Sequence, residues 1–296
     1  MTNVRLLTPL PVLQIDYDSE RSLVISDLHL GWEISFAEKG IFIPSQTSRM
    51  LARLMTIIEN QKPDRLVIIG DVKQSIPRIS LEEWRTIPLF FERLETAVSE
   101  IWVAKGNHDG DLEPLTPPSV RILPSSGFTL GEDPRIGLFH GHAWPSTDVL
   151  TSQLLVMGHI HPVLWFQDNM GLWMVRQVWV RALCRGSHLT KSLRDHQQLS
   201  EDDGPVRLAD SRVTIMPAFN DLLGGVSVNN FKGRLLGPLL GSECIDLPSA
   251  ELYLLDGTYL GEVQQLGQNR GNNVRRSVGG RFWRKYPEGS QGEGNE

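Results

Sequence analysis

The chain has 296 residues, of which 40% are apolar, so it can fold into one large domain or two smaller ones. Its net charge of −6 gives no overall nucleic-acid-binding signature, and no apolar stretch approaches the roughly 18 residues needed to span a bilayer. Two cysteines and no secretory leader pattern lead us to expect a soluble, cytoplasmic protein without membrane partners.

The first predicted elements are two strands that form a hairpin over residues 11–26. Turn-forming residues separate two apolar runs, which is typical of antiparallel strands. The second run, LVI at 23–25, leads directly into Asp27 and His29. Because burying an unpaired carboxylate costs several kcal/mol, Asp27 needs a partner, and a metal ion is one such partner.

A helix and a second buried strand follow. Apolar residues recur at helical spacing over residues 45–60, and Pro63 comes just past the expected helix end. The segment RLVIIGD, residues 65–71, then predicts a strand that ends in Asp71.

The next helix is predicted from its first residues. Ser80 and Glu83 match a capping box, so a helix should begin there and run to about Ser99. Pro88 lies inside this pattern and predicts a kink or a break.

Three further predicted strands also end in polar side chains. They are IWVAKGNHD at 101–109, RIGLFHGH at 135–142 and LLVMGHIH at 154–161. Together they end in Asn107, His108, Asp109, His140, His142, His159 and His161. Six of the eight histidines of the chain therefore follow predicted strands, which random placement would rarely produce.

The remainder of the chain is more β-rich and ends in a polar tail. A polar segment at about 185–205 predicts an exposed insertion. Residues 267–296 are rich in Gly, Asn, Arg, Ser and Glu, which predicts a flexible basic tail. We expect one domain over residues 1–266, and its pattern of elements favours a mixed α/β sandwich.

The polar strand ends point to metal chemistry. Ligands of α/β sheets bind beyond the carboxyl ends of the strands, so strands that run alike would bring these groups to one rim. Imidazole, carboxylate and amide oxygen suit Mn²⁺, Zn²⁺ or Fe²⁺. There are enough candidates for two ions, and two ions about 4 Å apart can clamp a phosphoryl group during in-line displacement.

The blocks DLH, GD, GNHD, HGH and GHIH, in this order over residues 23–161, resemble the calcineurin-like metallophosphoesterases. The resemblance implies an α/β/β/α sandwich of two mixed β-sheets flanked by helices. The segments MPAFNDLLGG and YLLDGTYLG are further similar to archaeal phosphoesterases related to the SbcD nuclease.

The resemblance implies a role for each matching residue. The site would hold two divalent ions, Mn²⁺ foremost, with Zn²⁺ or Fe²⁺ as alternatives. One ion would be held by Asp27, His29 and His161, and the other by Asn107, His140 and His159, while Asp71 would bridge both. His108 would contact the scissile phosphate and protonate the leaving oxygen. His142 would contact substrate or replace His140 as a ligand. Where the family commonly carries another polar residue beyond the bridging Asp, this chain has VKQ at 72–74.

Other polar residues have simpler interpretations. Asp109 could orient a neighbouring histidine, remain solvated or bind metal. Lys73 and Arg78 could approach a substrate phosphate, but we expect both at the surface. His188 and His196 lie in the predicted insertion and should be solvated.

Three tryptophans closely follow predicted site blocks. Trp32, Trp144 and Trp165 could stack on nucleobases, although packing around the site is the favoured interpretation. Cys184 and Cys244 are expected to be small core residues.

These observations predict a two-metal phosphoesterase that hydrolyses phosphodiesters, favouring nucleic-acid ends in DNA or RNA repair. A phosphodiesterase of cyclic nucleotides is the alternative substrate class, and a metal-binding scaffold without catalysis is the alternative of another kind. The basic tail could track a phosphate backbone, and a homodimer or a repair-protein partner is left open.

Overall fold

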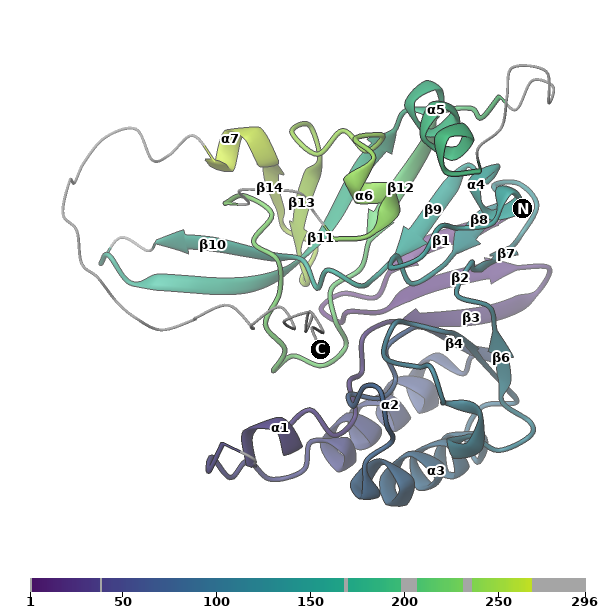
Figure 1. Cartoon of the computed structure of the whole chain (residues 1–296), viewed down its shortest axis with the longest axis vertical. Coiled ribbons are helices and arrows are strands. Elements are labelled where there is room, and N and C mark those ends of the chain that lie inside the picture. Colours follow the sequence, from purple (N-terminus) through teal and green to yellow (C-terminus); the bar gives the residue numbers. More distant parts are fainter. Residues whose placement is uncertain (1, 38, 168–169, 198–206, 231–235, 268–296) are drawn as a thin grey trace, which may run out of the picture.

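Two β-sheets pack face to face between outer layers of helices in the computed structural model (Figure 1). The structure describes residues 2–37, 39–167, 170–197, 207–230 and 236–267. This arrangement confirms the predicted α/β/β/α sandwich. The expected tail lies, from residue 268 onward, outside the described residues.

The first sheet has six strands in the order of the chain. They are β1 (Asn3–Leu6), β2 (Leu13–Tyr17), β3 (Glu20–Ile25), β4 (Arg65–Ile69), β5 (Glu100–Ala104) and β6 (Arg121–Leu123). The predicted hairpin is confirmed, since β2 and β3 pair in antiparallel fashion. From β3 to β6 the strands are parallel, so their carboxyl ends meet at one edge.

The second sheet has eight strands and is mixed. Its path is β14 (Tyr259–Glu262), β13 (Glu251–Leu254), β11 (Trp173–Cys184), β12 (Ser211–Ile215), β9 (Leu154–Met157), β8 (Ile136–Leu138) and β7 (Phe128–Leu130), with β10 (Val163–Gln167) paired to β11. The three strands β8, β9 and β12 are parallel.

Helices cover both outer faces. They are α1 (Ile34–Ala37), α2 (Thr47–Gln61), α3 (Leu81–Glu95), α4 (Thr147–Leu150), α5 (Gly186–Gln197), α6 (Pro238–Gly241) and α7 (Val263–Gly267), with a 3₁₀ turn at Glu113–Leu115. Among the described residues, no helix is long and apolar enough to cross a membrane.

The helix predictions were partly right. The capping box of Ser80 and Glu83 is present at the start of α3. Of the predicted kink or break at Pro88, the break is wrong, because α3 continues through Pro88. The Trp84 carbonyl, which loses its helical donor, belongs to an exposed residue. The predicted exposed insertion is also wrong in part, because α5 buries Leu189 and Leu193 in the core.

Alternation along the strands builds three apolar layers. In β4, Leu66 and Ile68 pack against α2 and α3, whereas Val67 and Ile69 face the second sheet. In β11, Val178 faces the helices of the other outer layer and Trp179 faces the first sheet. Cys184 and Cys244 are buried free thiols, as expected.

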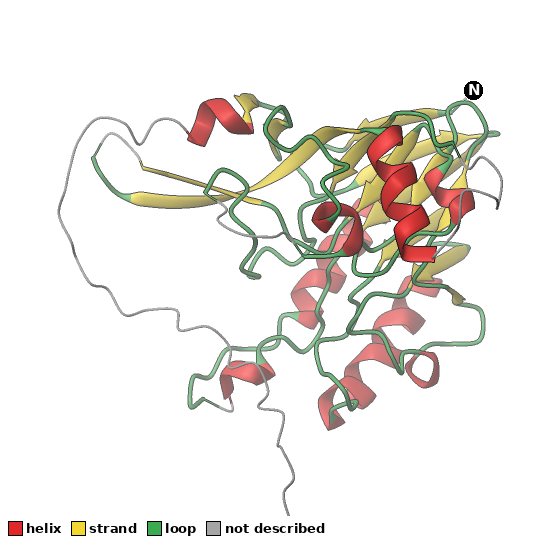
Figure 2. Cartoon of the chain, turned by 45° about the horizontal axis from the view of Figure 1, so that its top comes forward, coloured by secondary structure: helices red, strands yellow, loops and turns green. Residues whose placement is uncertain are grey.

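The hairpin of β10 and β11 extends beyond the body of the sandwich. Figure 2 shows the two strands reaching past the other strands of the second sheet. In both views the hairpin projects on the same side of the molecule as α1. This position matters because the candidate site opens on that side.

Candidate metal centre

The polar residues predicted at strand ends lie at the carboxyl edge of both sheets. The first sheet contributes Asp27 and His29 after β3, Asp71 after β4, and Asn107 and His108 after β5. The second sheet contributes His140 after β8, and His159 and His161 after β9. The structure therefore brings groups from two sheets together at one centre.

The backbone at this centre is strained. Among the described residues, nine non-glycine residues have positive φ, and five of them are candidate ligands: Asp27 (56°), His29 (44°), Asp71 (51°), His159 (73°) and His161 (44°). Such left-handed conformations cost about 1–3 kcal/mol each and persist where the surroundings impose them. They turn each side chain from the strand direction into the shared centre.

One cluster is formed by Asp27, His29 and His161. Their potential ligand atoms lie within 4.8 Å of one another, and His161 Nε2 is 3.2 Å from Asp27 Oδ1. The Nε2 atoms of His29 and His161 are buried and make no hydrogen bond. Buried nitrogens without a hydrogen-bond partner next to a carboxylate fit a cation held by all three residues.

A second cluster is formed by Asp71, His140 and His159. The Nε2 atom of His140 is 3.2 Å from Asp71 Oδ2, 3.2 Å from His159 Nδ1 and 3.2 Å from Asn107 Oδ1. Asp71 Oδ2 is also 3.3 Å from His29 Nε2. Asp71 therefore contacts histidines of both clusters.

Backbone carbonyls fix which nitrogen of several rings faces the centre. The Nδ1 atoms of His140 and His161 lie 2.9 Å from Ile69 O and 3.1 Å from Gly224 O. Because a carbonyl only accepts, each Nδ1 must carry a hydrogen, and in the neutral ring Nε2 keeps its lone pair. The Nε2 lone pair of His140 then meets two oxygens and a further imidazole, an arrangement that a cation stabilises.

Electrostatics supports this interpretation. Burial alone would raise the pKa of Asp71, but the neighbouring His140 and His29 lower it well below its usual range. Burial alone would lower the pKa of His140, but Asp71 and Asp27 raise it to about 9. Burial and then His140 lower the pKa of His159 to about 4, so its ring is neutral and able to ligate.

His108 forms a third group of potential ligands with His29 and Asp71, and it also lines an open cavity. Its ring is 4.7 Å from the ring of His29, and its Nδ1 donates to Gln74 O at 2.6 Å. The cavity has a volume of about 690 Å³ and is also lined by His29, Trp32 and His161. His108 can therefore reach a molecule in the cavity through Nε2.

His142 lies at the outer side of the second cluster. Its ring is 5.3 Å from that of His140, and it belongs to none of the candidate metal clusters among the described residues. Its Nδ1 is buried without a hydrogen bond, and burial, followed by His140, lowers its pKa to about 4. This position is compatible with a substrate contact.

Three glycines allow the close packing of the ligands. A Cβ atom at Gly70 would collide with the His140 ring, one at Gly106 with the Asp71 carboxylate, and one at Gly158 with Asp27. Only glycine leaves room for these contacts.

Two residues near the site, Lys73 after β4 and Asp109 after β5, behave differently from expectation. Lys73 was expected at the surface but is fully buried, with Nζ donating to Ser75 O, because the segment after Asp71 folds back under the site. Asp109 is also fully buried, and accepts hydrogen bonds from Val72 N and Gly106 N at 2.9 Å each. Asp109 therefore joins the loops that follow β4 and β5. Arg78 is exposed as expected.

Two supporting residues, Gln74 and Asn220, were not predicted from the sequence. Gln74 Oε1 lies 2.8 Å from His29 Nδ1, so Gln74 contacts both His29 and, through its carbonyl, His108. Asn220 Nδ2 donates to Leu28 O at 3.1 Å, beside Asp27. Two features of the sequence could have pointed to these residues. Gln74 lies in the segment 72–74 that departs from the family pattern, and Asn220 lies in the MPAFND segment.

The model of the calcineurin-like phosphoesterase family matches residues 21–204, which is well over half of the chain and includes every strand end described above. The chain belongs to this family. It is therefore a hydrolase of phosphoesters, and its family depends on two metal ions. The donor set at the centre fits that requirement.

Solved structures with the same fold include the Pseudomonas putida nuclease MPE. It has 17% sequence identity and a TM-score of 0.51, and the match covers 88% of this chain and 100% of the nuclease. The Escherichia coli phosphoesterase YfcE has 21% identity and a TM-score of 0.32, covering 51% of this chain and 75% of YfcE. No curated protein sequence matches the chain.

The three tryptophans near the site of this calcineurin-like phosphoesterase differ in their surroundings. Trp32 packs on Phe36, with ring centroids 4.7 Å apart, and Trp144 stacks on His196 at 5.1 Å. Both rings therefore pack on neighbouring side chains, and Trp32 also lines the cavity at His108. His196 is not merely solvated. Trp165 lies on the projecting hairpin and remains 39% exposed.

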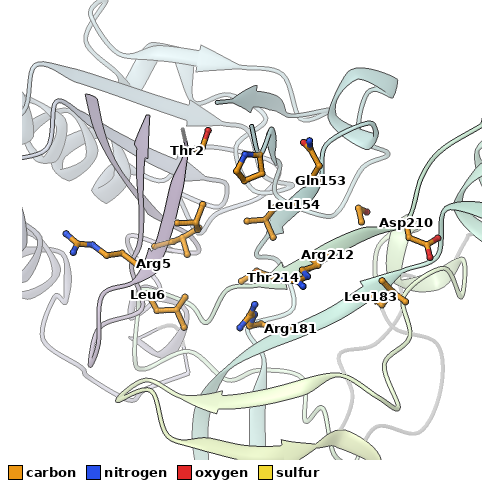
Figure 3. Close-up of a pocket in the computed structure, with 14 residues that line it drawn as sticks. Thr2, Arg5, Leu6, Gln153, Leu154, Arg181, Leu183, Asp210, Arg212 and Thr214 are labelled. Atoms are coloured by element: carbon orange, nitrogen blue, oxygen red, sulfur yellow. The ribbon is translucent and has the colours of Figure 1, made fainter. Parts of the chain in front are cut away.

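A second cavity of about 700 Å³ lies between the sheets at the end opposite the metal centre. Figure 3 shows Arg181 on β11 and Arg212 on β12 at its wall, with Leu154 and Thr214 nearby. None of the candidate metal ligands lines it. The histidine-rich site, and not this cavity, is therefore the candidate metal centre.

Proposed function

We propose that this calcineurin-like phosphoesterase hydrolyses phosphodiester bonds with two divalent ions, Mn²⁺ foremost. Asp27, His29 and His161 would hold one ion, Asn107, His140 and His159 the other, and Asp71 both. The observation that carries this proposal is the position of Asp71, whose carboxylate contacts histidines of both clusters. A carboxylate shared in this way is what a dinuclear site requires.

The metal ions would stabilise negative charge on the phosphate oxygens and lower the pKa of a water molecule. The protein side chains would orient the substrate beside the two metal ions and transfer protons to it. His108, held through Nδ1 by the Gln74 carbonyl, would donate a proton from Nε2 to the leaving oxygen. His142 would contact the substrate from the side of His140.

We propose nucleic-acid ends as the substrate class. The cavity at His108 is open, so the end of a longer polymer can enter it. The similarity of MPAFNDLLGG and YLLDGTYLG to phosphoesterases related to SbcD supports this choice. A structural neighbour of the same fold is described as a nuclease.

An assay with each metal supplied separately tests the function. The purified protein would receive Mn²⁺, Zn²⁺ or Fe²⁺ together with bis(p-nitrophenyl) phosphate, p-nitrophenyl phosphate, a cyclic nucleotide, or end-labelled single- and double-stranded DNA and RNA. We expect cleavage of the model diester and of polynucleotides with Mn²⁺. Asp71→Asn should abolish both activities, whereas the exposed Asp111→Asn should retain them. Inactivity toward every ester with every metal would instead support a metal-binding scaffold, and cleavage of the cyclic nucleotide alone a small-molecule phosphodiesterase.

We further propose that residues 1–266 form the catalytic domain and that the basic segment 267–296 helps to bind polynucleotides. Deleting residues 267–296 should reduce polynucleotide cleavage and leave cleavage of the model diester unchanged. If the deletion leaves the cleavage rates of both substrates unchanged, the tail does not have the proposed role.

A further inference from the structure

The projecting hairpin exposes one face of the second sheet. In β11, the side chains of odd-numbered residues point toward the first sheet, where Trp179 is fully buried. Trp173 and Val175 lie on the same side but beyond the end of the first sheet, and they are 58% and 45% exposed. The inner face of the second sheet therefore continues into solvent.

Trp165 completes this exposed face. It is the cross-strand partner of Val175, and Gln167 is the partner of Trp173. Residues directly opposite on neighbouring strands project on the same side. We call the exposed side chains of Trp165, Gln167, Trp173 and Val175 the overhang face.

The other side of the hairpin is partly covered, although Arg176, the cross-strand partner of Leu164, is exposed. Leu164 is 5% exposed, and Phe166 packs against the core cluster that also contains α5. Asn229 also holds the backbone of Trp165 through two hydrogen bonds of 3.1 and 2.8 Å. The hairpin is thus fixed from one side, and its overhang face is left open.

The overhang face lies on the side of the metal centre. β10 begins two residues after His161. At the base of the face, the Gln177 side chain donates a hydrogen bond to Ala218 O at 2.9 Å. Phe219, which follows Ala218, donates its backbone N–H to the carbonyl of Ser26, the residue before Asp27. A polymer held at the metal centre would therefore have the overhang face next to it.

We propose that the overhang face is a stacking platform for the bases of a single-stranded nucleic acid whose scissile phosphodiester lies at the metal centre. This inference rests on the proposed function and deepens it. The face carries no charged side chain and presents two indole rings, which suit the flat, uncharged surfaces of bases. The scissile phosphodiester would lie at the metal centre, and the platform would bind the neighbouring bases without help from the metal ions.

The geometry selects unpaired bases. Bases inside a duplex already stack on their neighbours and offer no face to a tryptophan. Because every base has a π-face, such a platform would accept any sequence. The enzyme should therefore favour single strands, or duplex ends that fray, without strong sequence preference.

Binding to metal-free protein tests the platform without cleavage. The Kd of a labelled single-stranded oligonucleotide would be measured by fluorescence anisotropy in EDTA for wild type, Trp165→Leu, Trp173→Leu and the double variant. Loss of one stacking contact should weaken binding by about 5- to 150-fold. The Phe variants should retain most of the affinity, because phenylalanine also stacks. Trp84→Leu is the matched control, since Trp84 is 47% exposed on α3 in the opposite outer layer.

The small diester separates this inference from the proposed function. All overhang variants should hydrolyse bis(p-nitrophenyl) phosphate as wild type does, because the overhang face holds no metal ligand. If wild type hydrolyses no diester, the proposed function fails, and the metal-free Kd values still decide the platform. An unchanged Kd in the double variant, or no binding by wild type, would overturn the inference. A dimer that dissociates in the double variant, with oligonucleotide binding unaltered, would also overturn it and assign the face to a second copy of the chain.

Discussion

Replacing Glu83 with glutamine would remove the charge that fixes the segment following β4. Glu83 is fully buried, and its Oε1 accepts from Gln74 N at 3.0 Å and Ser75 N at 2.7 Å. Its Oε2 accepts from Ser80 N at 2.7 Å and Ser80 Oγ at 2.9 Å. Through Gln74, the same carboxylate supports the contacts to His29 and His108.

The expected loss follows from these contacts. A glutamine side chain has one oxygen acceptor, and its NH₂ group would face donors that lose their partner. Two buried donors left unsatisfied cost about 1–3 kcal/mol each, so Glu83→Gln should lower the free energy of unfolding by about 2–6 kcal/mol at pH 7. Mn²⁺ binding should also weaken, within the roughly 10–100-fold range seen when outer partners of metal ligands are lost.

The dependence on pH gives an independent check. Burial alone would raise the pKa of Glu83, but hydrogen bonds from Ser75 and Ser80 lower it below its ordinary value of 4.5. A carboxyl whose pKa is lower in the folded than in the unfolded state stabilises the fold fully above the unfolded pKa. That stability is lost as the pH falls through the folded pKa. The difference between wild type and Glu83→Gln should therefore narrow below pH 4.5.

Urea unfolding of the metal-free proteins at several pH values measures this difference. Glu82→Gln is the control, because Glu82 lies in the same first turn of α3 but is only half-buried. It should change stability by less than about 0.5 kcal/mol. Equal stability of Glu83→Gln and wild type at pH 7, or a gap that widens in acid, would refute the reasoning.

Three further predictions concern the metal centre. His108→Ala should lower kcat by about 10²–10⁴-fold for a diester with a poor leaving group, and less for p-nitrophenol esters. The metal content of this variant should be retained, and loss of one metal equivalent would instead make His108 a ligand. Gly106→Ala places a methyl group against the Asp71 carboxylate, so the free energy of unfolding should fall by about 1–3 kcal/mol. The Mn²⁺ affinity measured by calorimetry should fall as well, and an unchanged affinity would contradict the close packing. Because Asp71 raises the pKa of His140 to about 9, Mn²⁺ binding at pH 7 should release a proton, and this release should disappear well above pH 9. Titrations in buffers of different ionisation enthalpy measure it, and no release at pH 7 would count against His140 as a ligand.

Much of the fold could be predicted because local patterns agreed with the final packing. The apolar run before Asp27, the capping box at Ser80 and the helical spacing over residues 45–60 each depend on near neighbours in the chain. The meeting of Asp27 and Asp71 also followed, since the parallel strands β3 and β4 bring their carboxyl ends to one edge. His159 reaches the same centre from β9 of the second sheet, which strand direction alone does not predict.

The supporting contacts could not be predicted from the sequence. Gln74 reaches His29 and His108 only because the segment after β4 turns back toward α3, and the same turn buries Lys73. The exposure of Trp173 depends on where the first sheet ends, which involves strands far away in the chain. In the same way, α5 became a core helix because its leucines meet the outer face of the second sheet.

The left-handed backbone at the metal centre implies a trade-off between thermal stability and activity. Asp27, His29, Asp71, His159 and His161 hold conformations that glycine adopts at no steric cost. A laboratory selection for heat resistance alone would therefore be drawn toward glycine at these positions and would inactivate the enzyme. Selection under metal starvation would act in the reverse direction and retain the strained residues.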